Sequence, residues 1–223
     1  MLVQQQWLPA LTGRAGARDD ARALARRTRE RNRARVRKAL VEAADTLFER
    51  KGFDATTADE IAALAGVSRS SFFRYFATKE AIAFPNAEQR LVDFVDLVQS
   101  RLTEMTPFEA VRRSALLVGD SYMKEPELEL RRQSIVDGSP TLVVAELDVY
   151  RRWETALVEV LNPPDVSATR RRRGVFFAGA ACSVIRTALR EWYDGGATAD
   201  LTALGREAFA SLECGFSDLE MKG

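Results

Sequence analysis

Apolar residues recur along most of the chain at spacings of three and four, which is the period of amphipathic helices. The pattern is clearest in residues 31–51, at Val36, Leu40, Ala43, Ala44, Leu47 and Phe48. Gly52 follows Arg50 and Lys51, an arrangement typical of a helix C-terminus. We therefore expect a first helix that ends at this glycine.

Two short helices are predicted next. Thr57 followed three residues later by Glu60 forms a capping box and starts a helix over about 58–65. Gly66 favours the left-handed conformation that ends a helix, and Ser68 caps a second helix over about 69–76. Two short helices joined by a glycine-containing turn form a helix-turn-helix.

The rest of the chain is also predicted to be helical. Thr78 caps a helix that starts at about 79, which Pro85 kinks or ends, and the apolar spacing continues through 91–102. Further helices are expected over about 107–124, 126–137, 141–161, 168–193 and 200–213, delimited by proline, glycine and capping residues. No strand alternation and no repeat is visible. The pattern predicts an all-α fold of about nine helices.

Charge is distributed unevenly. Residues 1–85 carry 16 basic and 10 acidic residues, a net charge of +6, whereas residues 86–223 carry 17 and 22, a net charge of −5. The steepest excess lies in residues 14–38, with 11 basic against three acidic residues. A basic first part indicates an anionic partner. The alternative is a solvated helix face or a disordered tail.

Composition excludes several classes of protein. The 223 residues are 46% hydrophobic and 29% charged, which is typical of a globular chain of one or two domains. The absence of histidine removes His-based metal sites and catalytic triads. Cys182 and Cys214 lack the spacing of a zinc or redox site, and they are expected to be reduced thiols. We see no signal peptide and no apolar run long enough to span a membrane.

The motifs in the sequence do not support an enzyme. Gly119-Asp120-Ser121 is similar to a hydrolase nucleophile motif, but it lacks a histidine base and falls within a predicted helix. No phosphate-binding loop, dinucleotide fingerprint or metal-ligand cluster is present. We therefore predict a cytoplasmic protein that is not an enzyme, has no cofactor and does not associate with a membrane.

The segment 68–76 carries the candidate chemistry. At 100° per residue, Phe72 and Phe76 share a core-facing side, while Ser70 and Arg74 point nearly opposite. A helix fits the DNA major groove, where arginine can bond guanine through two atoms. The alternative is an ordinary amphipathic helix with solvated arginines.

The stretch from about 35 to 84 resembles the TetR family of transcriptional regulators. The matching elements are Lys51-Gly52-Phe53, Glu60-Ile61-Ala62, Ala65-Gly66-Val67-Ser68, Phe72-Phe73-Arg74-Tyr75-Phe76 and Thr78-Lys79-Glu80. The resemblance implies a homodimer that places two helix-turn-helix heads in consecutive major grooves of a palindromic operator. Residues 85–223 fit the family's helical ligand-binding and dimerisation domain by length and helix count.

Carried onto this sequence, the resemblance and the helix geometry give the DNA-contacting positions Thr57, Ser68, Arg69, Ser70, Ser71, Phe73, Arg74, Tyr75 and Lys79. The family often has tyrosine at the position of Phe73, whose ring can instead touch a thymine methyl. Residues 1–28 are expected to be a basic arm before the 29–84 head. Arg31 and Arg33 are candidates for minor-groove reading, with general phosphate attraction as the alternative.

The resemblance also implies a small ligand in the second domain. The expected lining is Phe94, Val98, Phe108, Val111, Tyr122, Arg132, Ile135, Tyr150, Trp153, Phe177 and Arg186, with plain core or surface charge as the alternative. The stretches 131–135, 139–140 and 150–154 resemble a branch of the family with acyl-CoA-like ligands. Arg170–Arg173 lies near a predicted helix N-terminus, where the helix dipole disfavours cations, and the sequence does not explain it.

Dimerisation is assigned to the last two helices, through Gly174, Ala178, Ala181, Leu201, Leu204, Ala208 and Leu212. The sequence thus predicts a ligand-responsive DNA-binding regulator, most simply a repressor that a small hydrophobic or acyl-CoA-like ligand releases from its operator. The alternative is a non-catalytic helical interaction protein with non-specific DNA binding.

Overall fold

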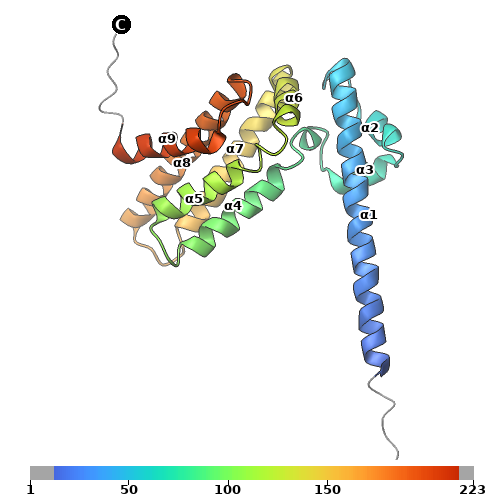
Figure 1. The fold of residues 1–223 in the computed structure, drawn as a ribbon, viewed down its shortest axis with the longest axis horizontal. Helices are drawn as coiled ribbons and strands as arrows, with labels where there is room; N and C mark the ends of the chain where they lie inside the picture. The colour runs from blue at the N-terminus through green and yellow to red at the C-terminus, as the bar shows by residue number, and fades with distance from the viewer. Residues whose placement is uncertain (1–12, 216–223) are drawn as a thin grey trace, which may run out of the picture.

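The computed structural model describes residues 13–215, with side chains from residue 24 onward. Within this range the chain forms nine α-helices and one 3-10 helix, and no strand (Figure 1). They are α1 (Gly13–Lys51), α2 (Ala58–Leu64), α3 (Arg69–Tyr75), η1 (Glu80–Ala83), α4 (Ala87–Arg101), α5 (Pro107–Gly119), α6 (Pro126–Asp137), α7 (Pro140–Leu161), α8 (Ala168–Asp194) and α9 (Leu201–Cys214). The predicted all-α class is confirmed.

Three elements differ from the sequence-based expectation. The helix expected over 107–124 ends at Gly119, so Asp120 and Ser121 lie in the turns after α5 and not within a helix. The helix expected from Lys79 onward is only the short η1, because Pro85 disfavours helical backbone at Phe84 before it. The first helix begins at Gly13, so residues 13–28 of the expected arm continue α1 as helix. Residues 1–12 of that arm lie outside the described residues. The helix ends at Gly52, whose φ of 80° suits glycine, as predicted.

The head is built on the C-terminal half of α1. Its buried core joins Leu40 and Phe48 of α1 to Ile61 of α2 and Phe72 of α3. The same core continues into residues 136 and 142, which belong to α6 and α7. The head therefore packs directly on the second domain.

The second domain is formed by α4–α9. Its core gathers Phe94 and Val98 of α4, Val111 of α5, and Leu157 and Leu161 of α7. Ala178 and Ala181 of α8 and Phe209 of α9 complete it. No helix in the described part of the chain is both long and apolar enough to cross a membrane.

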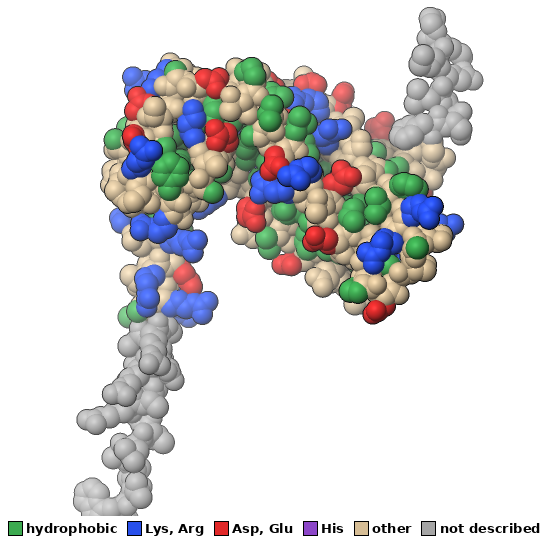
Figure 2. All heavy atoms as spheres, turned by 180° about the vertical axis from the view of Figure 1, so that it is seen from behind, with side chains coloured by type: hydrophobic (Ala, Val, Ile, Leu, Met, Phe, Trp, Pro, Cys, Tyr) green, Lys and Arg blue, Asp and Glu red, His purple; other side chains and the backbone are tan. Residues whose placement is uncertain are grey.

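The N-terminal half of α1 projects beyond the rest of the head as a free rod (Figure 1). Every side chain from residue 24 to 35 is exposed. Basic side chains gather around this projecting part, as Figure 2 shows from behind. The excess of positive charge found in the sequence is thus displayed on a helix that no other described element covers.

Candidate DNA-binding head and ligand cavities

The start of α2 is fixed by the predicted capping box. The Thr57 hydroxyl accepts a hydrogen bond from the Glu60 amide at 3.3 Å, and Glu60 accepts one from the Thr57 amide at 2.9 Å. Lys51 donates to the same Glu60 carboxylate at 2.6 Å. The hydrogen bond from Lys51 has the largest effect and those from Thr57 add to it, and together they lower the pKa of Glu60 to about 2. Glu60 is therefore ionised at neutral pH, and α2 is tied to the end of α1.

The start of α3 is fixed in a similar way. The Ser68 hydroxyl accepts from the Ser71 amide at 3.2 Å and lies 3.0 Å from the hydroxyls of Ser70 and Ser71. Phe72 is fully buried in the head core. The buried ring sets the rotation of α3, so that the opposite side of this helix faces solvent.

The outer face of α3 carries Arg69, Phe73 and Arg74, all of them exposed. Arg69 pairs with Asp59 of α2 at 2.9 Å, and Arg74 donates to the Ser71 hydroxyl at 3.0 Å. The Phe73 side chain is 42% exposed. Surface contacts of this kind contribute little stability, so a DNA base or phosphate can replace them at low cost.

Lys79 contacts the backbone of the head itself. Its ammonium group donates to the carbonyl oxygens of Phe53 at 3.0 Å and Thr56 at 2.9 Å, and it lies 3.9 Å from the centre of the Phe53 ring. Lys79 therefore ties the segment after α3 to the loop before α2. An ammonium group has three N–H donors, so these two hydrogen bonds do not decide the phosphate contact, which stays a prediction. Tyr75 is half-buried against the head core.

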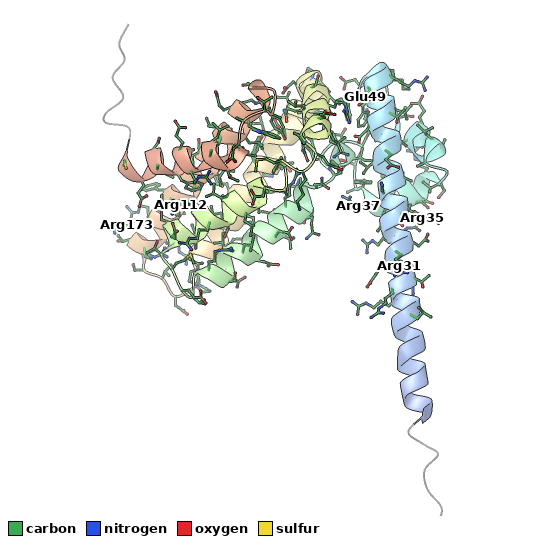
Figure 3. All side chains as sticks on the ribbon, viewed as in Figure 1. Arg31, Arg35, Arg37, Glu49, Arg112 and Arg173 are labelled. Atoms are coloured by element: carbon green, nitrogen blue, oxygen red, sulfur yellow. The ribbon has the colours of Figure 1, made fainter. Side chains whose placement is uncertain are left out.

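Arg31 and Arg33 lie on the projecting helix, where Figure 3 labels Arg31 together with Arg35. An α-helix is about 10 Å across, whereas the minor groove is about 6 Å wide. In this helical form the two arginines are suited to general attraction to phosphates. Reading the minor groove would require the helix to unwind.

An apolar cavity of about 60 Å³ lies among α5, α7, α8 and α9. Its wall is almost entirely apolar and includes Val118, Tyr122, Trp153, Ile185 and Leu189. Such a space suits the apolar part of a small molecule.

A second cavity, of about 80 Å³, lies where η1 and the start of α4 meet α6, α7 and α8. Its wall carries charged and hydroxyl side chains. Arg90 pairs with Glu129, both nearly buried, and its guanidinium lies 3.5 Å from the centre of the Tyr122 ring. The Tyr150 hydroxyl donates to Glu146 at 3.3 Å. We call these two spaces the apolar and the polar compartment.

The predicted pocket residues fall into three groups. Tyr122 and Trp153 line the apolar compartment, and Tyr122, Arg132 and Tyr150 line the polar one. Phe94, Val98, Phe108, Val111 and Phe177 belong to the second-domain core, and Ile135 packs against the head core. Arg186 is exposed, with its guanidinium 5.7 Å from the Tyr150 ring centre. The first group lines the two compartments.

Sequence reasoning missed Arg90, Glu129 and Tyr193, which also line the polar compartment. Arg90 and Glu129 were missed because single charges on amphipathic helices are typical of solvated surfaces. Their pairing across 39 positions depends on how α4 packs against α6. The spacing of residues along either helix does not show it.

The predicted dimer residues fall into two sets, one buried within the protomer and one that faces outward. Gly174, Ala178, Ala181 and Leu201 are buried within the protomer itself. Gly174 lets α8 approach Asn162, whose Oδ1 would lie 2.3 Å from an added Cβ. Leu204, Ala208 and Leu212 line a groove between α8 and α9 with Ala180, Val184 and Thr187. Only this second set faces outward, where a partner subunit can reach it.

Two family profiles match the chain. Residues 40–84 match bacterial regulatory proteins of the tetR family, and residues 105–217, just over half of the chain, match the MftR C-terminal domain. The chain belongs to the TetR family. This membership confirms the predicted class, a helix-turn-helix transcriptional regulator rather than an enzyme.

Curated TetR-family relatives and solved structures agree with this assignment. The putative mycofactocin biosynthesis regulator MftR of Mycobacterium tuberculosis is 24% identical over 129 residues, 58% of this chain and 65% of the relative, slightly under two thirds of its length. The regulator TcmR of Streptomyces glaucescens is 27% identical over 183 residues, 79% of this chain and 80% of the relative. A TetR-family regulator of Streptomyces coelicolor A3 has the same fold, with 21% identity, a TM-score of 0.55, and coverage of 81% of this chain and 94% of that structure.

Proposed function

We propose that this TetR-family chain is a homodimeric repressor that acts in the cytoplasm, binds a palindromic operator and leaves it when a small, largely apolar ligand binds. The observation that carries the proposal is the outer face of α3. The N-terminus of this helix is capped, and the buried Phe72 sets its rotation. Its outer face therefore displays Arg69, Phe73 and Arg74 together.

Each exposed side chain has a matching feature in the major groove. Arg69 and Arg74 can bond guanine O6 and N7 once they leave Asp59 and Ser71, and Phe73 can pack on a thymine methyl group. Two heads related by a two-fold axis would bind half-sites about 34 Å apart. The basic rod of α1 adds phosphate attraction that is independent of sequence.

Dimerisation is proposed through the outward residues of the groove between α8 and α9. Leu204→Glu on α9 should give a monomer in sedimentation experiments, since an unpaired carboxylate would be buried at an apolar interface. Ala203→Glu is a matched control because Ala203 is exposed on the same helix and does not line the groove. A Leu204→Glu dimer of unchanged stability would contradict this placement.

Ligand release requires a second conformation. The two compartments have volumes of about 60 and 80 Å³, whereas sites for small molecules are usually about 300–1,000 Å³. A ligand would therefore bind an expanded state more tightly than the compact one and shift the population towards it. Arg132 lines the polar compartment and also pairs with Asp45 of α1, so expansion there disturbs a link to the head.

An acyl-CoA-like ligand would place its chain in the apolar compartment. The run Arg170–Arg173 is not placed to bind its phosphates, because these arginines lie at the start of α8, and Figure 3 labels Arg173 at the outer end of the domain. Val184 is the first α8 residue that lines the apolar compartment. Val184 lies eleven positions after Arg173 along the helix, a distance of about 16 Å. The arginine run is thus not at the edge of this compartment.

The test is selection of bound duplexes from a random library by the purified full chain at moderate salt. We expect an inverted repeat, and we expect Arg69→Ala and Arg74→Ala to relax the preference at particular bases. Arg206→Ala serves as the control because Arg206 is exposed on α9, far from the head. Recovery of no preferred sequence, with binding that disappears as salt rises, would support the non-specific interaction protein instead.

A further inference from the structure

The apolar and polar compartments meet at two residues. Tyr122 of the segment after α5 and Leu189 of α8 line both of them. A single molecule that moves the Tyr122 ring aside would therefore have an apolar end on one side and a polar end on the other.

The charged groups of the polar compartment already have partners. Arg90 pairs with Glu129, and Arg132 pairs with Asp45 at 2.7 Å. Glu146 lies 3.5 Å from Arg190. An additional charge that entered this space would lose its hydration without gaining a free counter-ion, which is costly.

The balance of charge also gives no advantage to an anion. Arg190 is shared between Glu146 and Asp137, with a distance of 3.0 Å to the Asp137 carboxylate. The charged side chains that line the compartment balance, with Arg90 and Arg132 against Glu129 and Glu146. A ligand carboxylate would therefore meet no excess of positive charge.

A hydroxyl group in the wall of the polar compartment is available to donate a hydrogen bond to a ligand. The Tyr193 hydroxyl has no hydrogen-bond partner among the described residues, although its side chain lies in the wall of the compartment. Burial raises the pKa of Tyr193 above its usual value, so the group keeps its proton and can donate. Burial likewise raises the pKa of Tyr122. An oxygen atom with free lone pairs is the natural acceptor for such groups.

We propose that the polar compartment binds the uncharged oxygen-bearing end, a carbonyl or hydroxyl group, of a molecule whose apolar body lies in the apolar compartment, with Tyr193 as hydrogen-bond donor. This inference rests on the proposed ligand-responsive function and specifies its ligand class. It excludes a free carboxylate or an ammonium group at this position.

Three probes of nearly the same shape test the ligand class by calorimetric titration of the full chain. They are 4-phenylbutan-2-one, which carries a carbonyl, 3-phenylpropanoate, in which a charged oxygen replaces its methyl group, and butylbenzene, which has no oxygen. We expect the ketone to bind about tenfold or more tighter than the carboxylate, because of the cost of burying an unpaired charge. Tighter binding of 3-phenylpropanoate than of the ketone, or no binding of the ketone, would overturn the proposal.

Tyr193→Phe tests the residue. Removing the hydroxyl should weaken binding of 4-phenylbutan-2-one about five- to tenfold, the size of one neutral hydrogen bond, and leave butylbenzene binding unchanged. Equal losses for both probes, or none for the ketone, would contradict the assignment. Tyr122→Phe is the matched control in the same wall, and it should change binding of the ketone and of butylbenzene to the same degree.

These outcomes are separable from those of the proposed function. The titrations measure binding to the protein alone and do not involve DNA. If the protein selects an inverted repeat but shows no preference for the uncharged probe, only this inference about the ligand is contradicted. Selective ketone binding by a chain that selects no DNA sequence would instead contradict the repressor proposal.

Discussion

Arg132 of α6 and Asp45 of α1 form an ion pair of 2.7 Å that joins the second domain to the head. Their side chains are only 13% and 18% exposed. Two further contacts lie beside it, between Arg131 and Glu49 at 3.3 Å and between Ser139 and Asp54 at 3.1 Å. The α6 region is thus connected to the head by side chains as well as by the shared core.

Breaking this pair should destabilise the protein. Asp45→Asn leaves the Arg132 guanidinium largely buried without its counter-ion, and we expect a loss of about 2–4 kcal/mol in the free energy of unfolding. Arg132→Met combined with Asp45→Leu should cost less than the sum of the single changes, measured by denaturant unfolding as a double-mutant cycle. Additive effects would show that the pair does not couple the domains. Arg131→Met is a control at an exposed pair and should cost less than about 1 kcal/mol.

Lys79→Met should distinguish a structural role from a phosphate contact. Because the ammonium group holds the Phe53 and Thr56 carbonyls, we expect a loss of about 1–2 kcal/mol in unfolding free energy and weaker operator binding. The slope of log affinity against log salt should not change. A slope reduced by about one, with stability preserved, would assign Lys79 to a phosphate.

Gly174→Ala should destabilise the second domain. The added Cβ would lie 2.3 Å from the Asn162 Oδ1 atom, so α8 or the Asn162 side chain must shift, at a cost of about 1–3 kcal/mol. Gly179→Ala on the same helix is the matched control, because its Cβ meets only the flexible Glu154 carboxylate, at 3.3 Å. Thermal unfolding compares the two. Equal melting temperatures would mean that the contact with Asn162 relaxes freely.

The projecting part of α1 should contribute electrostatic affinity without sequence preference. Arg31→Gln with Arg33→Gln should lower the salt slope of operator binding by about two and weaken binding to every duplex to a similar degree. Lys38→Gln tests whether any exposed cation on α1 has the same effect. A change in the selected base sequence, rather than in affinity alone, would favour minor-groove reading.

The sequence predicted the elements whose causes are local. The capping residues Thr57 and Ser68, the glycine at 52 and the spacing of apolar residues depend on neighbours a few positions away, and the structure confirms the helices that they predict. Lys79 could not be placed in this way, because its partners lie 23 and 26 residues earlier in the chain. The polar compartment was likewise visible only in part, since Arg90 and Glu129 become partners through the packing of α4 against α6.

The small residues of α8 also show what a sequence cannot decide about helix packing. Gly174, Ala178 and Ala181 were expected at the dimer interface, but the structure buries them against helices of the same protomer. Composition indicates that another helix comes close. It does not say which chain supplies that helix, because intramolecular and intermolecular packing require the same small side chains.

The burial of residues 136 and 142 in the head core bears on how modular this protein is. The predicted boundary after residue 84 separates two stretches of sequence, but Val136 and Leu142 fill space among the side chains of the head. A head cut at that boundary would expose the apolar surface that these two residues cover. A chimera that joins this DNA-binding head to a different ligand-binding domain would therefore have to keep α6 and the start of α7 together with the helix-turn-helix. Mutations near α6 that change ligand binding would also alter the stability of the head.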